Sequence, residues 1–273
     1  MFTDAVLVLV GHGTTLNENS ALPVYQHAGE LRARGVFGEV CEAFWKQEPG
    51  VTGVVSSRIA QRVFIVPLFI SEGYFSEEVI PRELGFRGSG REWSRILRRD
   101  KQTFYYCKPI GTHERMTAVV LERARAVVEQ TGSPPAAETT LILAGHGTER
   151  NANSRRSIER QVELLRSRNI YADVHAVFLD EEPPIPSCYE LARTNSLIVV
   201  PFFMSDGLHT QEDIPVLLGK PKADVKQRVQ TGQSVWKNPT ALCGKLVWYS
   251  ASVGSAPEIA EVILERVREA ARG

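Results

Sequence analysis

Two histidines flanked by glycines occur at a constant spacing along the chain. Gly11-His12-Gly13-Thr14 returns as Gly145-His146-Gly147-Thr148, 134 residues later. Each motif follows an apolar run typical of a buried strand, so each histidine is expected at the carboxyl end of a strand, where ligands bind in open α/β sheets. Flanking glycines leave room for a close approach of ligand and backbone. A single copy would fit a tight strand-to-helix turn equally well, but the recurrence favours a functional role.

A second repeated motif differs between the copies. Residues 205–215 read Ser-Asp-Gly-Leu-His-Thr-Gln-Glu-Asp-Ile-Pro, whereas residues 71–81 read Ser-Glu-Gly-Tyr-Phe-Ser-Glu-Glu-Val-Ile-Pro. His209 therefore corresponds to Phe75, and only the second half can bring two motif histidines, His146 and His209, to one strand-end site. Two imidazoles suit a divalent metal such as zinc, copper, iron or nickel. Either ring can also take a proton near neutral pH.

Acidic residues accompany these motifs, with two interpretations each. Glu212, matched by Glu78, lies three residues after His209, which on a helix is the same face and suits a carboxylate assisting an imidazole. Glu212 and Asp213 both also fit a first helical turn, where acids favour the helix dipole. Asp213 in addition resembles a capping pair with Thr210. Glu182 follows the second strand and is either a substrate or proton-relay residue or an exposed acid before a helix that begins at a proline.

The repeat extends over most of the chain and sets the expected domains. We expect an N-terminal domain at 1–131, a linker at 132–137 that contains two prolines, and a C-terminal domain at 138–273. Apolar runs without polar alternation predict parallel strands covered on both faces by helices. The fold class is therefore α/β, with two homologous flavodoxin-like domains, each a four-stranded parallel sheet flanked by helices. The expected strands are Ala5–Val10, Glu39–Phe44, Arg62–Phe69 and Thr103–Cys107, then Thr140–Ala144, Ala172–Phe178, Ser196–Phe203 and Lys245–Ser250.

Composition excludes several classes of protein. The 32 Lys and Arg balance 32 Asp and Glu, which argues against a nucleic-acid binder. No apolar run approaches the ~20 residues of a membrane helix, and the first residues lack the positive segment of a signal peptide. The four cysteines lie far apart, which is typical of free thiols in a reducing compartment. We expect a cytoplasmic protein, and without a phosphate-binding loop nothing indicates use of ATP.

These motifs together resemble the sirohydrochlorin cobaltochelatase family, the CbiX-type class II chelatases, in a long form with two fused domains. The resemblance rests on the Gly-His-Gly-Thr turns and on the segment from Pro201 to Pro215. It implies insertion of a divalent metal (Co²⁺ first, with Ni²⁺ or Fe²⁺ as alternatives) into sirohydrochlorin or a related tetrapyrrole. By this resemblance no ATP, no tightly bound cofactor and no iron–sulfur cluster are expected, and the fused pair can act as a monomer.

Carried over by position, the resemblance makes His146 the proton acceptor and a metal ligand, with His209 the second ligand. The tetrapyrrole would contact Glu182 and the segment Met204, Ser205, Asp206, Gly207 and Leu208. The first half departs from the pattern at Phe75 and Val79, and by the resemblance it forms the other wall of the cleft. His12 and Glu78 are possible secondary residues.

Two other functions remain open from the sequence. The first is a non-catalytic metal or tetrapyrrole carrier derived from a chelatase, which the Phe75 substitution motivates. The second is a flavodoxin-like anion- or nucleotide-binding module, in which glycine-rich turns precede helix N-termini. Such a module would not need His209, so the effect of His209→Ala on binding discriminates it from the other two.

Overall fold

The structure is a computed structural model that describes residues 2–13, 20–87, 93–129, 131–132, 134–148 and 152–273. Thr14, the last residue of the first glycine–histidine motif, lies outside the described residues. The chain divides into two compact units. Unit 1 comprises residues 1–113 and 257–273, and unit 2 comprises residues 114–256.

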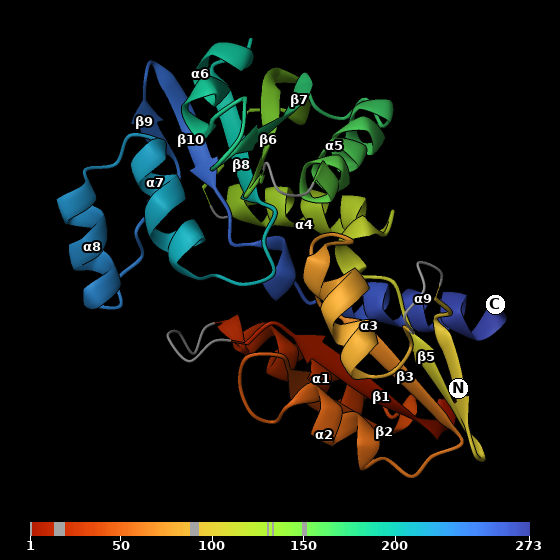
Figure 1. Cartoon of the computed structure of the whole chain (residues 1–273). Coiled ribbons are helices and arrows are strands. Elements are labelled where there is room, and N and C mark those ends of the chain that lie inside the picture. The colour runs from red at the N-terminus through yellow and green to blue at the C-terminus, as the bar shows by residue number, and fades with distance from the viewer. Residues whose placement is uncertain (1, 14–19, 88–92, 130, 133, 149–151) are drawn as a thin grey trace. The chain divides into compact units, whose positions relative to one another are not determined.

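Unit 1 is built on a five-stranded sheet in the order β2-β1-β3-β5-β4 (Figure 1). Strand β1 is central and pairs in parallel with both β2 and β3, and β3 pairs in parallel with β5. Nearly all of β1 beyond its first three residues is buried, as expected for a strand covered on both faces. The strands are β1 (Phe2–Gly11), β2 (Phe37–Phe44), β3 (Arg62–Pro67), β4 (Ile96–Arg99) and β5 (Gln102–Tyr106).

Unit 2 repeats this topology in the order β7-β6-β8-β10-β9. Central strand β6 is buried along its whole length and pairs in parallel with β7 and β8, and β8 pairs in parallel with β10. The strands are β6 (Thr139–Gly145), β7 (Asp173–Phe178), β8 (Ser196–Pro201), β9 (Thr240–Leu242) and β10 (Lys245–Tyr249). Two homologous α/β sheets confirm the expected fold class.

The number of strands in each sheet differs from the expectation of four. A fifth strand, β4 or β9, pairs antiparallel with the neighbouring parallel strand to form an edge hairpin. Neither strand has a buried residue, and β9 spans only three residues. Edge strands this short and exposed carry no apolar run, so no sequence pattern indicates them.

The helices follow the strands, and two of them belong to the unit opposite to their repeat. Helix α4, in the first repeat, packs against β8 and β10 of unit 2, while α9, in the second repeat, packs against β3 and β5 of unit 1 (Figure 1). Packing therefore divides the chain after residues 113 and 256, whereas the sequence repeat divides it at 132–137. The α-helices are α1 (Leu22–Ala33), α2 (Val51–Ser56), α3 (Ile80–Glu83), α4 (Met116–Glu129), α5 (Ala152–Ser167), α6 (Cys188–Leu191), α7 (Ile214–Leu217), α8 (Lys222–Gln230) and α9 (Ile259–Arg272).

In each repeat, one short π-helical segment follows the third strand and carries the second motif. The two segments are η2 (Phe75–Val79) in unit 1 and η6 (His209–Asp213) in unit 2. Such π-helical turns are frequent at functional sites. Within the described ranges, no helix is both long enough and apolar enough to cross a membrane.

Candidate metal and proton-transfer site

The glycine–histidine turn of unit 2 depends on both of its glycines. A Cβ atom at Gly145 would lie 2.0 Å from Ile158 Cδ1, so this glycine lets α5 pack against the end of β6. Gly147 has a φ of +69°, a left-handed conformation that side chains other than glycine rarely adopt. The two glycines therefore fix His146 at the carboxyl end of the central strand.

His146 and His209 lie together in unit 2, as the sequence predicted. Their ring centroids are 4.9 Å apart and the ring planes are close to perpendicular, at 83°. The two side chains are 44% and 48% exposed, so both rings are accessible to a ligand. Phe203 lies beside both rings, with centroids 6.4 Å from His146 and 6.0 Å from His209.

The hydrogen bonds of the two rings define which nitrogen is free for chemistry. His146 Nδ1 lies 2.8 Å from the carbonyl oxygen of Gly147 and 3.2 Å from Asp180 Oδ2. His209 Nδ1 lies 2.7 Å from Asp213 Oδ2. A carbonyl or carboxylate oxygen only accepts, so Nδ1 carries the hydrogen in both rings and the lone pair remains on Nε2. Each Nε2 is thus the atom suited to bind a metal ion or take a proton.

Asp180 and Asp213 are the site residues that the sequence analysis missed. Asp213 was interpreted mainly as an acid of a first helical turn, yet its carboxylate bonds the His209 ring, and η6 has no side-chain cap. Asp180 follows β7, two residues before Glu182. Its position after the end of a strand is the sequence feature that could have indicated a site residue. A carboxylate bonded to Nδ1 orients an imidazole and raises the basicity of its other nitrogen.

The carboxylate bonded to His209 is not that of Glu212, whose catalytic role stays a prediction. The carboxylate that reaches His209 comes from Asp213, four residues along, rather than from Glu212, three residues along. The π-helical segment explains the difference, because its wider turn aligns residue i with i+4 more closely than with i+3. Glu212 itself is half-buried.

Glu181 and Glu182 follow Asp180 and behave differently from one another. Glu181 is the more buried, and its Oε1 accepts a 2.7 Å hydrogen bond from the backbone nitrogen of Thr148, which fixes the turn after His146. The side chain of Glu182, the predicted substrate residue, is exposed, and its backbone carbonyl accepts a hydrogen bond from Arg155. Glu182 is therefore open to a ligand, while Glu181 supports the turn.

The segment from Met204 to Leu208 is held by contacts with the turn that follows β10. A Cβ atom at Gly254 would lie 2.2 Å from the carbonyl oxygen of Met204, so the two backbones are in direct contact. Asp206 accepts hydrogen bonds from the Ser252 nitrogen at 2.7 Å and from Ser255 Oγ at 2.6 Å. Both carboxylate oxygens of Asp206 are engaged in this way, which suits anchoring of the segment. Leu208 is 58% exposed, and Ser205 and Gly207 are half-buried.

In the described part of the chain, no group of three or more His, Cys, Asp or Glu side chains is placed to hold one metal ion. The arrangement in unit 2 is instead a pair of imidazoles, each backed by a carboxylate. Two nitrogen ligands leave most of the coordination sphere of a divalent ion for water or a substrate. A structural site, by contrast, surrounds its metal with protein ligands.

The equivalent position in unit 1 has a different character. His12 Nδ1 bonds the carbonyl oxygen of Gly13 at 2.9 Å, as His146 does with Gly147. Its ring, however, is surrounded by Trp45, Phe69 and Phe75, with centroids at 5.6, 6.4 and 5.0 Å. Burial lowers the pKa of His12, and the charge of Lys46 lowers it further. The hydrogen bond with Gly13 opposes both effects.

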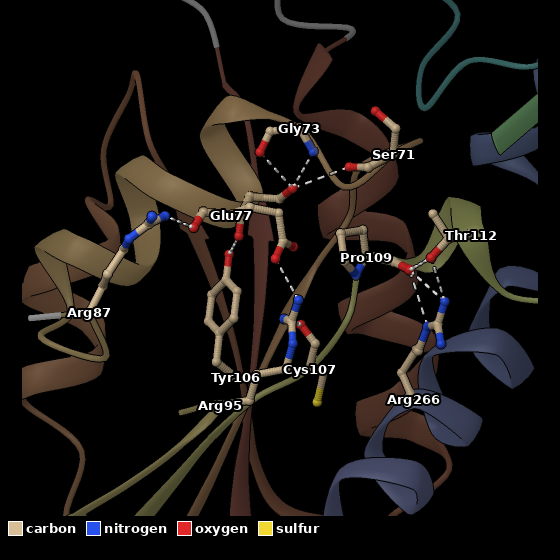
Figure 2. A network of polar contacts seen from close by, with 11 residues as sticks. Ser71, Gly73, Glu77, Arg87, Arg95, Tyr106, Cys107, Pro109, Thr112 and Arg266 are labelled. Atoms are coloured by element: carbon tan, nitrogen blue, oxygen red, sulfur yellow. Dashed lines mark hydrogen bonds and ion pairs between the residues drawn. The ribbon is translucent and has the colours of Figure 1, made fainter. Parts of the chain in front are cut away.

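A polar network holds η2 in unit 1 (Figure 2). Tyr106 Oη donates a 2.7 Å hydrogen bond to the carbonyl oxygen of Ser76, and Arg95 bonds Glu77 Oε2 at 2.6 Å. Burial raises the pKa of the Glu77 carboxyl, although the Arg95 charge opposes the shift. In unit 2, Tyr249 Oη donates a 2.6 Å hydrogen bond to Thr210 in the same way. The tyrosine anchor is therefore common to both units.

Comparisons with known proteins agree with the duplication. The CbiX family model matches residues 6–127 and again residues 140–270. A probable sirohydrochlorin cobaltochelatase of Halobacterium salinarum is 41% identical over 97% of this chain and 91% of its own length. A sirohydrochlorin cobaltochelatase of Methanopyrus kandleri is 28% identical over 48% of this chain and 95% of its own length. That protein is thus equivalent to about one repeat.

Solved structures share the fold. The multi-domain protein DR2241 of Deinococcus radiodurans, described as structurally similar to chelatases, superposes with a TM-score of 0.80 and 28% identity. The match covers 98% of this chain and 55% of DR2241. SirB of Bacillus subtilis superposes with a TM-score of 0.69 at 20% identity, covering 98% of this chain and 96% of its own.

Proposed function

We propose that this chain, which belongs to the CbiX family, inserts a divalent metal ion into sirohydrochlorin or a closely related tetrapyrrole without ATP. Co²⁺ is the first candidate, because the relatives from Halobacterium salinarum and Methanopyrus kandleri are named as cobaltochelatases. The observation that carries the proposal is the pairing of His146 with His209, each bonded through Nδ1 to a carboxylate or carbonyl oxygen.

Metal insertion needs a group that accepts protons and a site that releases the ion. Two pyrrole N–H groups lose their protons while the ion exchanges water for ring nitrogens. Nε2 of His146 has one lone pair, because the ring hydrogen lies on Nδ1, so it is suited to accept such a proton as the ion moves from it to the ring nitrogens. The proton can then be passed to solvent, which reaches the half-exposed ring.

His209 is suited to hold the incoming ion beside His146. Asp213 fixes the ring of His209 and increases the basicity of its Nε2. Because the described residues offer the ion two imidazoles, we propose that its remaining ligands are water, which exchanges readily for the nitrogens of the macrocycle. We propose that the exposed carboxylate of Glu182 and the segment from Met204 to Leu208 contact the tetrapyrrole.

An anaerobic insertion assay tests the proposal directly. Purified protein, sirohydrochlorin and Co²⁺ are mixed, and the absorption change of the macrocycle is followed against a control without enzyme. We expect wild-type protein to accelerate insertion and His146→Ala to lose at least about a hundredfold in rate, the lower end of general-base effects. His175→Gln is the matched control, because His175 lies on β7 beside Asp173, outside the site.

The outcome also discriminates the two alternatives. A wild-type rate equal to the uncatalysed rate, with tetrapyrrole nonetheless bound, contradicts a chelatase and supports a carrier. Binding of anions or nucleotides that is unaffected by His209→Ala supports the flavodoxin-like module. Faster insertion that is lost in His146→Ala and retained in His175→Gln excludes both.

A further inference from the structure

Unit 1 contains a cavity between its edge hairpin, formed by β4 and β5, and helix α9. Figure 1 shows α9 beside β5. The cavity has a volume of about 340 Å³, which is in the range of small-molecule sites. The described residues that line it belong neither to the glycine–histidine turn nor to η2. Its apolar walls include Ile96, Tyr105 and Ala270, and its cations are Arg95, Lys108 and Arg266.

Arg266 and Glu269 form a fixed wall of this cavity. Arg266 is 5% exposed and donates from Nε and Nη2 to the carbonyl oxygen of Pro109, at 3.1 and 2.9 Å (Figure 2). Its Nη2 also bonds Thr112 Oγ1 at 2.8 Å. Glu269 Oε2 accepts a 2.7 Å bond from Arg266, and its Oε1 lies 3.3 Å from His113 Nε2. Both oxygens of the Glu269 carboxylate therefore already face a partner.

Arg95 and Lys108 retain unused hydrogen-bond donors. Arg95 donates to the carbonyl oxygen of Cys107 at 3.2 Å and to Glu77 Oε2 at 2.6 Å (Figure 2). A guanidinium has more N–H groups than these two bonds use. Lys108 is exposed and makes no hydrogen bond or ion pair with any residue that the structure describes. The Cys107 thiol, which also lines the cavity, adds no negative charge, because burial raises its pKa to about 12.

The duplicated unit 2 indicates which of these features the scaffold needs. The two edge hairpins have the same pairing register, so their residues can be matched position by position. Arg266 matches Arg123, which likewise donates to the carbonyl oxygen of Ser252 and to Ser255 Oγ. This arginine is therefore part of the scaffold in both units.

The other two cations are particular to unit 1. Lys108 matches Ala251, and Arg95 matches Asn238, whose side chain bonds the backbone of β10. The same scaffold thus forms in unit 2 with neutral residues at both positions. Structural need alone does not explain an ammonium and a guanidinium beside the cavity of unit 1.

The aromatic wall differs between the units as well. Tyr105 is half-buried, and one face of its ring stacks on Phe64, with centroids 4.7 Å apart and planes at 14°. Trp248 holds the matching position in unit 2, where it is 2% exposed and donates a 3.0 Å hydrogen bond from Nε1 to Thr131. A larger, buried ring therefore occupies the position at which unit 1 keeps an accessible one.

We propose that this cavity binds a small aromatic carboxylate, with the ring between the hairpin and α9 and the carboxylate beside Lys108 and Arg95. Apolar walls favour an organic anion over a bare inorganic ion, and the ring of Tyr105 suits packing against a flat ring. Hydrogen bonds from a guanidinium or an ammonium to a carboxylate are charge-assisted and therefore strong. The site shares no residue with those proposed for metal insertion, so the two proposals can fail separately.

The test is a titration of the full chain with 2-naphthoate, followed by the fluorescence of this ligand, and in parallel with its neutral analogue 2-naphthamide. Lys108→Glu should weaken 2-naphthoate binding about five- to tenfold, because an ion pair is lost and a repulsion is added. Its affinity for 2-naphthamide should stay that of wild type. Lys101→Glu is the matched control, because Lys101 is an exposed lysine at the other end of β5.

A second pair of variants tests where the ring binds. Ala270→Phe places a bulky side chain in the cavity and should abolish binding of both ligands. Ala271→Phe, at the exposed next residue of α9, should bind both as wild type does. Urea unfolding checks that the two variants are equally folded.

Each outcome decides the proposal. Charge-dependent loss in Lys108→Glu together with loss in Ala270→Phe supports it. No 2-naphthoate binding by wild type below about 1 mM, the weak end of ligand affinity, indicates a cavity that holds only solvent and contradicts it. Equal affinities within either pair of variants also contradict it. His146→Ala should bind 2-naphthoate as wild type does, so a failure of metal insertion leaves this proposal unaffected.

Discussion

The two units have the same backbone scaffold but carry different side chains at the strand-end site. In both, a tyrosine at the end of the fourth parallel strand bonds the carbonyl of the π-helical segment, at 2.7 Å from Tyr106 and 2.6 Å from Tyr249. In both, a glycine brings two backbone segments into contact: Gly111 against Ile70 and Gly254 against Met204. The side chains that these anchors position differ in chemical type between the two units.

Unit 2 presents two imidazoles and two carboxylates, whereas unit 1 presents one imidazole, aromatic rings and an ammonium. Asp213 is exposed and bonded to His209, but the aligned Val79 is 5% exposed and belongs to the core. The backbone anchors of this fold are therefore separable from the side chains that carry its chemistry. Metal chemistry should therefore depend on a few side chains of unit 2, and its absence from unit 1 should follow from three substitutions.

The carboxylates of unit 2 give the largest expected effect in this comparison. Asp213→Asn should lower the insertion rate about 10- to 100-fold, as removal of a carboxylate behind a metal-binding imidazole typically does. Asp180→Asn should have a smaller effect, because its contact with His146 is longer, 3.2 Å against 2.7 Å. Steady-state insertion rates measure both, with Glu190→Gln, an exposed acid on α6, as control. A wild-type insertion rate in Asp213→Asn would show that insertion does not depend on the Asp213 carboxylate.

Gly111 and Gly254 occupy equivalent positions, so substituting each tests whether the two scaffolds contribute equally to stability and unequally to activity. A Cβ atom would lie 2.1 Å from the Ile70 oxygen at Gly111 and 2.2 Å from the Met204 oxygen at Gly254. Gly111→Ala and Gly254→Ala should each destabilise the protein by about 1–3 kcal/mol, as overpacking does, in urea unfolding. Only Gly254→Ala should also lower the insertion rate per folded molecule, about tenfold. Equal loss of activity in both variants would contradict the separation of the two sites.

Introducing into unit 1 the carboxylate and the second imidazole of unit 2 tests whether these side chains are sufficient for metal binding. The double variant Lys46→Asp with Phe75→His leaves Val79 in the core and recreates the pair formed by His146 and Asp180. It should bind one Co²⁺ more per chain than wild type, counted by equilibrium dialysis. Phe75→His alone should bind this ion more weakly, because Lys46 still repels it. No additional Co²⁺ in the double variant would show that unit 1 differs by more than these side chains.

The smallest expected effect concerns the titration of His12. Its pKa lies below the ordinary value of 6.5, chiefly because of burial. The folded state therefore binds the proton less tightly than the unfolded chain, so this contribution to stability is complete above about pH 6.5 and declines as the pH falls below it. Lys46→Met should raise the pKa of His12 by less than about one unit, measured by NMR titration. An unchanged pKa would show that the Lys46 charge does not reach the ring.

Much of this architecture could be predicted from the sequence, because buried strands leave a clear signal. The eight apolar runs correspond to the eight parallel strands of the structure. The glycine–histidine motif lies at the end of each central strand, as predicted. Repetition of Gly145 and Gly147 at a fixed spacing was enough to indicate a constrained turn. The pairing of His146 with His209 followed from both motifs lying at the same edge of one sheet.

The rest depended on features that sequence patterns do not carry. The exposed edge strands β4 and β9 have no apolar periodicity, and the packing of α4 and α9 on the other repeat's sheet is a matter of tertiary contacts. The choice between Glu212 and Asp213 turned on a π-helical segment, which no pattern predicted. The aromatic surroundings of His12 required Trp45 and Phe69, which come from two different strand ends.

If unit 2 handles the metal and unit 1 does not, the number of Co²⁺ ions bound per chain depends on the histidine of unit 2 alone. Equilibrium dialysis of wild type, His146→Ala and His12→Ala at the same free Co²⁺ concentration gives the number of ions per chain. We expect about one ion for wild type and for His12→Ala, and none at this site for His146→Ala. Two ions in wild type, or loss of the ion in His12→Ala with retention in His146→Ala, would contradict it.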